Sequence, residues 1–102
     1  MSPSDFKTQK MNRNEARKLI SELAKSQRVH ILKHAFERME ERNVSTQDAL
    51  NVLESPSSII EKDGELEKGS YRYRLSTRKI ILVVSFKSDG SLVYILTVMR
   101  KL

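Results

Sequence analysis

Three polar side chains at helical spacing are the first candidates for chemistry in this 102-residue chain. His34, Arg38 and Arg42 recur every four residues, so on a helix they spread over only about 80° and form one continuous edge. An imidazole at such an edge can serve as a general acid or base beside two cations. The alternative interpretation is structural: the arginines pair with Glu37 or Glu41, and the histidine caps or packs. Taken alone, this feature favours the structural interpretation.

A basic strand is the second candidate. The residues from 71 to 75 alternate with a period of two, which predicts a half-buried strand. If its tyrosines face the helices, Arg72 and Arg74 project from the opposite face. With Lys87 near a strand end, they could hold a phosphate backbone and offset charge in a transition state. The alternative is an uncovered sheet face that charge keeps soluble.

The distribution of charge supports a polyanionic partner. The formal net charge is +6, and acids and bases cancel over the first 70 residues. From residue 71 onward seven basic residues, Arg100 among them, stand against one acid, and such a surface attracts phosphates. Tyr71 and Tyr73, on or near the basic face, could stack on an exposed base. A basic face that meets an acidic protein is the alternative.

The elements that must position these residues follow from hydrophobic periodicity. Helical spacing predicts three helices, over residues 13–25, 31–42 and 46–54. Strand patterns follow at 59–62, 71–75, 79–86 and 92–99, with a hairpin turn at 88–91. We therefore expect an α+β fold, with N-terminal helices packed on one face of a C-terminal antiparallel sheet. Residues 1–12 are expected to form a flexible arm and residues 13–102 a single domain, with a core that includes Ala35, Met39, Leu50, Leu82, Val84 and Ile95.

Several classes of protein are disfavoured. The chain has no cysteine, which excludes a disulfide scaffold and a thiolate zinc site. His30 and His34 lie four residues apart, but no acid at a matching position completes a set of ligands, so we expect no metal and no cofactor. No apolar run approaches the ~20 residues that cross a bilayer, and the N-terminus is polar. We expect a cytoplasmic protein without a membrane partner.

The stretch from His34 to Ser45, HAFERMEERNVS, resembles a known signature, H-A-x-x-R-M-x-x-R-x-[IV]-[ST]. That signature belongs to a domain-of-unknown-function family of small bacterial and phage proteins, and the resemblance extends over about residues 29–101. Its matching positions are His34, Arg38, Arg42 and Thr97. The family is similar to the RelE, MqsR and BrnT toxins, which pack helices on an antiparallel sheet. The resemblance implies an endoribonuclease acting on free RNA or ribosome-bound mRNA, and a cognate antitoxin as partner.

The leading hypothesis is therefore a metal-independent, toxin-type endoribonuclease (an mRNA interferase). The RNA 2′-OH would attack the adjacent phosphate, with His34 or a sheet-facing tyrosine as general acid or base. Arg72, Arg74 and Lys87 would stabilise the phosphorane. The residues expected to bind RNA are Arg38, Arg42, Tyr71, Tyr73, Thr97 and Arg100. The alternative is a non-catalytic module that binds nucleic acid or an acidic partner. The two differ in whether His34 and the sheet arginines converge on one phosphate-sized site.

Overall fold

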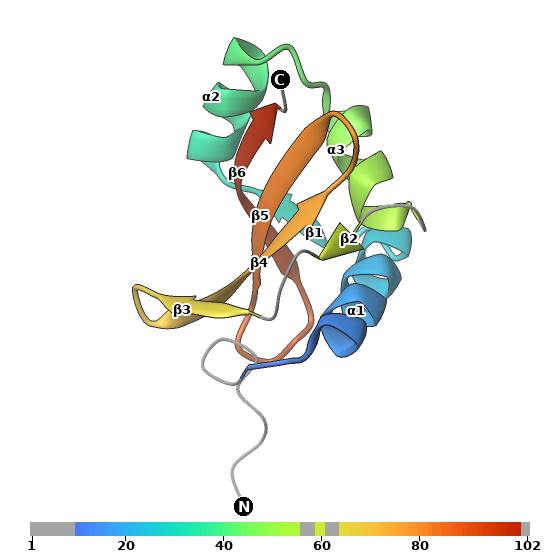
Figure 1. The fold of residues 1–102 in the computed structure, drawn as a ribbon, viewed down its shortest axis with the longest axis vertical. Coiled ribbons are helices and arrows are strands. Elements are labelled where there is room, and N and C mark those ends of the chain that lie inside the picture. Colours follow the sequence, from blue (N-terminus) through green and yellow to red (C-terminus); the bar gives the residue numbers. More distant parts are fainter. Residues whose placement is uncertain (1–9, 56–58, 61–63, 101–102) are drawn as a thin grey trace, which may run out of the picture.

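The computed structural model describes residues 10–55, 59–60 and 64–100. Along the chain the elements are α1 (Arg13–Lys25), β1 (Val29–Ile31), α2 (Lys33–Glu41), α3 (Thr46–Glu54), β2 (Ile59–Ile60), β3 (Glu65–Glu67), β4 (Ser70–Ser76), β5 (Ile80–Phe86) and β6 (Val93–Arg100). Figure 1 shows the helices gathered beside a twisted sheet. The predicted α+β class is confirmed. Most of the predicted N-terminal arm, residues 1–9, lies outside the described residues, as do residues 61–63.

Side chains cap the starts of α1 and α3, and a residue in the left-handed conformation follows α2. Asn12 Oδ1 accepts a hydrogen bond from the Glu15 N–H (2.9 Å) at the start of α1. At the start of α3, the Asp48 N–H donates to Ser45 Oγ (3.0 Å) and the Ser45 N–H donates to Asp48 Oδ2 (3.1 Å), which is a complete capping box. Asn43, two residues past the end of α2, has a φ of 55°, the left-handed conformation expected of a helix stop.

The sheet is mixed rather than purely antiparallel. Its strand order is β1-β6-β5-β4-β2, and β3 pairs with β4 beside this path. The antiparallel pairing of β4 with β5 and of β5 with β6 is as predicted. The edge strand β1 instead runs parallel to β6, with Val29 opposite Val93 and Ile31 opposite Ile95. The helical pattern predicts Ile31 in a helix, and a strand of only three residues is too short to show its own period in the sequence.

One core joins the three helices to the inner face of the sheet. Of the predicted core residues, Leu82, Val84, Ile95, Ala35 and Met39 are buried. Leu50 is only partly buried, and the neighbouring Val52 is buried in α3 instead. The opposite face of the sheet carries half-buried or exposed side chains: Arg72, Arg74, Val83, Tyr94, Thr97 and Met99. We call this second surface the outward face. Within the described part of the chain, no helix is long and apolar enough to cross a membrane.

Candidate nucleic-acid interface

The strand register places the predicted arginines and Thr97 on one surface. In β4 the inward side chains of Tyr73 and Leu75 are buried, so Arg72 and Arg74 project from the outward face, as predicted. Arg74 lies opposite Val83 of β5, and Val83 lies opposite Thr97 of β6. These three residues therefore form one row across the sheet, and two of them were predicted site residues.

The strand β3 adds two carboxylates that the sequence analysis did not include. Its pairing with β4 sets Glu65 opposite Arg72 and Glu67 opposite Ser70. A two-residue turn makes this connection, with positive φ at both Lys68 (50°) and Gly69 (84°), as a type I′ hairpin turn requires. Figure 1 shows this hairpin extending away from the helices. Glu65 and Glu67 consequently share the face of Arg72.

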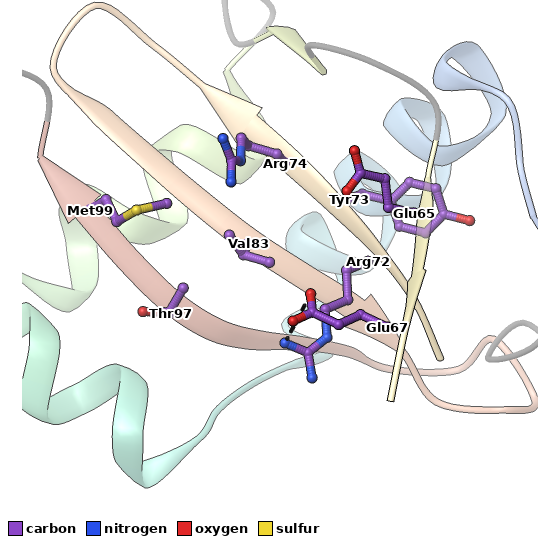
Figure 2. Close-up of a pocket in the computed structure, with 8 residues that line it drawn as sticks. All are labelled: Glu65, Glu67, Arg72, Tyr73, Arg74, Val83, Thr97 and Met99. Atoms are coloured by element: carbon purple, nitrogen blue, oxygen red, sulfur yellow. Dashed lines mark ion pairs between the residues drawn. The ribbon is translucent and has the colours of Figure 1, made fainter. Parts of the chain in front are cut away.

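A hollow of about 240 Å³ lies where β3 crosses the outward face. Its lining residues are Glu65, Glu67, Arg72, Tyr73, Arg74, Val83, Thr97 and Met99. Figure 2 shows Arg74, Val83 and Thr97 on neighbouring strands, with the Glu67 carboxylate beside the Arg72 guanidinium and the Glu65 side chain near the Tyr73 ring. The volume exceeds that of several water molecules, at about 30 Å³ each, so a phosphate group fits.

Arg72 is the least satisfied polar side chain of the hollow. Its Nη1 lies 3.7 Å from Glu67 Oε2, longer than the roughly 2.7–2.9 Å of a charge-assisted hydrogen bond. Its Nε is buried and has no hydrogen-bond partner among the described residues. A buried donor without an acceptor is costly, and a turn of the Arg72 side chain toward the hollow would let an oxyanion there accept from it. The arrangement is therefore suited to an anionic ligand.

The charge of the hollow differs from the sequence-based prediction. That prediction placed a basic surplus on the sheet, and it counted Glu65 and Glu67 in the electrically neutral first part of the chain. In the fold these two carboxylates face Arg72 and Arg74, so the formal charges of the hollow cancel. Long-range attraction at this point is consequently weaker than predicted. The hollow also holds a carboxylate beside an arginine, and a carboxylate can act as a general base.

The predicted edge of α2 forms a separate cluster. Arg38 Nη1 donates to Glu41 Oε2 at 2.8 Å, and Arg42 Nη1 lies 3.6 Å from the same oxygen. The hydrogen bond and charge of Arg38, with smaller contributions from Arg42 and His34, lower the pKa of Glu41. Arg100 Nη1 donates to the Arg42 carbonyl (3.0 Å). The arginines thus pair with Glu41, as the structural interpretation predicted, and His34 is exposed. None of these residues lines the hollow.

Of the predicted tyrosines and Lys87, only Tyr73 borders the hollow, and its side chain is buried. The Tyr73 side chain is 1% exposed; it packs edge-on against Phe86 (5.4 Å between ring centroids) and accepts a hydrogen bond from the Met11 N–H (2.9 Å). Its ring is therefore not available to stack on a base. Tyr71 pairs with Leu66, on the face of the hairpin away from the carboxylates. Lys87 is exposed, starts the β5–β6 turn and does not line the hollow.

The described residues include no group of three or more His, Asp or Glu side chains that could hold a metal ion. Apart from the buried Tyr73 phenol, the polar groups that line the hollow are two guanidinium groups, two carboxylates and the Thr97 hydroxyl. Guanidinium groups bind and neutralise phosphate, and carboxylates accept protons.

Fold and site together define a small α+β domain whose open sheet face carries a hollow of arginine and glutamate side chains. The chain belongs to the DUF4258 family, a domain of unknown function, whose model matches residues 31–100. The membership of a family of unknown function expected from the HAFERMEERNVS stretch is thus confirmed, and α1 lies outside the matched segment. No curated protein and no solved structure matches the chain. The family match contains no link to the RelE, MqsR or BrnT toxins.

Proposed function

We propose that this protein binds RNA on the outward face and cleaves it in the hollow with side chains alone. The observation that carries the proposal is the Arg72 guanidinium, whose buried Nε has no acceptor in the described part of the chain and whose contact with Glu67 is loose. A phosphate oxygen accepting from Nε would satisfy this donor. The planar fork of arginine would let a second oxygen of the same phosphate accept from a neighbouring N–H.

Arg74 and Thr97 extend the phosphate site along the sheet. Arg74 is exposed and shares the outward face with Arg72, two residues along β4, so it is placed to bind the same phosphate or the next one. The Thr97 hydroxyl, two strands away in the row of Arg74, can donate to a phosphate oxygen. Two cations and a hydroxyl would stabilise the charge that develops on the phosphorane.

Glu67 is the general base of the proposed reaction. Its carboxylate is more than half exposed and lies beside Arg72, so a phosphate bound by Arg72 brings an adjacent ribose within its reach. Glu67 takes the proton of the 2′-OH while the 2′ oxygen bonds to phosphorus. The bond from phosphorus to the 5′ oxygen breaks, and that oxygen takes a proton from water. The products are a 2′,3′-cyclic phosphate and a 5′-OH end.

The proposed cellular role is that of a toxin neutralised by a cognate antitoxin. Two features support this role. The HAFERMEERNVS stretch resembles the signature of a family that is similar to such toxins, and the part of the chain from residue 71 onward carries a surplus of positive charge. A cleavage reaction that recognises backbone phosphates discriminates little between RNAs, because phosphate contacts carry no sequence information. Such an activity would need a protein inhibitor in the cell that makes it.

Incubation of the purified protein with long single-stranded RNA in EDTA tests the proposal. We expect cleavage to 2′,3′-cyclic phosphate ends, and a fall of about 10²- to 10⁴-fold in rate for Glu67→Gln, the usual contribution of a general base. Arg72→Ala should lose both cleavage and affinity. His34→Ala is the matched control, because His34 is exposed and outside the hollow. Cleavage that survives in Glu67→Gln but not in His34→Ala would refute the assignment of the base.

A non-catalytic nucleic-acid-binding module is the second candidate. The observation in its favour is that the lining of the hollow contains no histidine, so no side chain there is a ready proton donor to the leaving group. In that case the wild-type protein binds RNA with a strong salt dependence and leaves it intact. Intact RNA after prolonged incubation, together with binding that Arg72→Ala weakens, would decide for this candidate.

A further inference from the structure

An aromatic pair lies on the outward face outside the hollow. The parallel pairing of β1 with β6 sets His30 directly beside Tyr94. Their ring centroids are 5.9 Å apart and the ring planes are inclined by 88°, an edge-to-face contact. In β6 the flanking residues Val93 and Ile95 are fully buried on the inner face, so Tyr94 and its neighbour His30 belong to the outward face.

This pair shares a row of the sheet with the phosphate-binding arginine. Tyr94 lies opposite Ser85 of β5. In the antiparallel register of β4 and β5, Tyr73 lies opposite Val84, so the next position sets Arg72 on the other side of Ser85. Two strand spacings separate Tyr94 from Arg72, roughly 10 Å between their Cα atoms. Ser85, the residue between them on β5, is small and buried, so no large side chain separates Tyr94 from Arg72 in this row.

We infer that His30 and Tyr94 form a base-stacking platform and that the RNA is therefore single-stranded. This inference rests on the proposed function, since the phosphate of the stacked nucleotide would be the one bound at Arg72. In an edge-to-face pair the ring that presents its edge keeps both of its faces clear of the contact. A base can stack on such a face only when it is unpaired and splayed out of its own helix.

The pair also has a simpler use as a cross-strand contact that holds the edge strand β1 on β6. Cross-strand aromatic contacts stabilise sheets by a fraction of what a stacked base contributes to binding. The two roles predict different results for Tyr94→Leu: a structural pair changes the melting temperature, whereas a platform changes RNA affinity. Tyr94→Phe keeps the ring and should keep the affinity.

The test uses oligoribonucleotides with 2′-O-methyl groups, which cannot undergo the 2′-OH attack, as single strands and as duplexes. Fluorescence anisotropy should show tighter binding of the single strand. Tyr94→Leu should weaken it by about 5- to 150-fold, the range of one lost stacking contact. Tyr71→Leu is the matched control, because this tyrosine lies on the other face of the β3–β4 hairpin. A single-strand probe with one abasic site should lose affinity for the wild-type protein but not for Tyr94→Leu.

The outcomes separate the platform from the phosphate site. If Arg72→Ala weakens binding and Tyr94→Leu does not, the phosphate site stands and the platform is wrong. Equal affinity for duplex and single strand also overturns the platform. If Tyr94→Leu does not fold, the abasic probe is tested with the wild-type protein and with Tyr94→Phe. Equal affinity of these proteins for abasic and complete strands overturns the platform. If the wild-type protein binds none of the probes, the proposed function fails together with the inference.

Discussion

Gly64→Ala tests how closely β3 must approach the core for the hollow to form. A Cβ at Gly64 would lie 2.6 Å from Cε1 and 2.8 Å from Cζ of Tyr73, well inside the 3.4 Å at which ordinary contact begins. The ring or the strand would therefore have to shift by roughly 0.8 Å, the difference between these distances and normal contact. Gly64 directly precedes Glu65, so a shift of the strand moves both carboxylates relative to Arg72.

The Tyr73 ring has little freedom to give way. It is 1% exposed, packs edge-on against Phe86, and its hydroxyl holds the Met11 N–H. Overpacking of a buried site costs about 1–3 kcal/mol. For a domain of about 100 residues each kcal/mol lowers the melting temperature by about 4–8 °C, so we expect a fall of roughly 4–24 °C. Cleavage should fall further than the folded fraction, because the wall of the hollow is displaced.

A double-mutant cycle with Tyr73→Leu identifies the cause. Urea denaturation of the four proteins gives the free energies of unfolding, and the cost of Gly64→Ala should largely disappear once the ring is removed. Gly69→Ala is the matched control: its φ is 84° and no atom lies within 4 Å of its added Cβ, so its cost, about 1–2 kcal/mol, comes from backbone strain. Tyr73→Leu should not relieve that cost. An equal cost of Gly64→Ala in both backgrounds would refute the steric explanation.

Three further predictions concern charge and capping. Arg72→Ala and Arg74→Ala should each reduce the slope of log affinity against log salt by about 0.7 to 1, measured by RNA titrations at several ionic strengths; unchanged slopes would remove these arginines from the interface. His34→Ala should keep its melting temperature in thermal denaturation, because the side chain is exposed; a fall of several degrees would make it a packing residue. Hydrogen bonds from the Ser45 backbone and side chain lower the pKa of Asp48. That contribution to stability is complete above the unfolded pKa of about 3.9 and is lost as the pH falls through the lower folded value, so Asp48→Asn should flatten the acid side of the stability–pH curve; an unchanged curve would contradict it.

Most of the fold was predictable because its signals are local. The caps at Asn12 and Ser45 depend on residues three positions apart, and the β5–β6 hairpin depends on Gly90, whose φ is 75°. The parallel strand β1 was not predictable in this way. Its three residues are held by pairing with β6, more than 60 positions later, and a pairing over that distance leaves no periodic pattern in the sequence.

The sequence predicted the two arginines and Thr97 of the candidate site, but not its carboxylates. Period-two alternation correctly turned Arg72 and Arg74 outward. The RNA contact predicted for Tyr73 came instead from its proximity to the basic face, and the alternation turns its side chain into the core. His34 matched a motif position, yet its position on α2 keeps it out of the lining of the hollow. Periodicity predicts which face of a helix or strand each residue occupies. Which elements meet depends on packing between them.

The turn at Lys68 and Gly69 is the feature that makes the hollow. The side chains of a strand alternate between faces, so a loop shifted by one residue would exchange the two faces of β3. With the two-residue turn, Glu65 and Glu67 lie on the face of Arg72, and Leu66 lies with Tyr71 on the other. With one residue more or fewer, Leu66 would lie beside Arg72 and the carboxylates would leave the hollow. The glycine after Lys68 was therefore the available signal: it permits a two-residue hairpin turn, and the register of that turn places the Glu67 carboxylate beside Arg72.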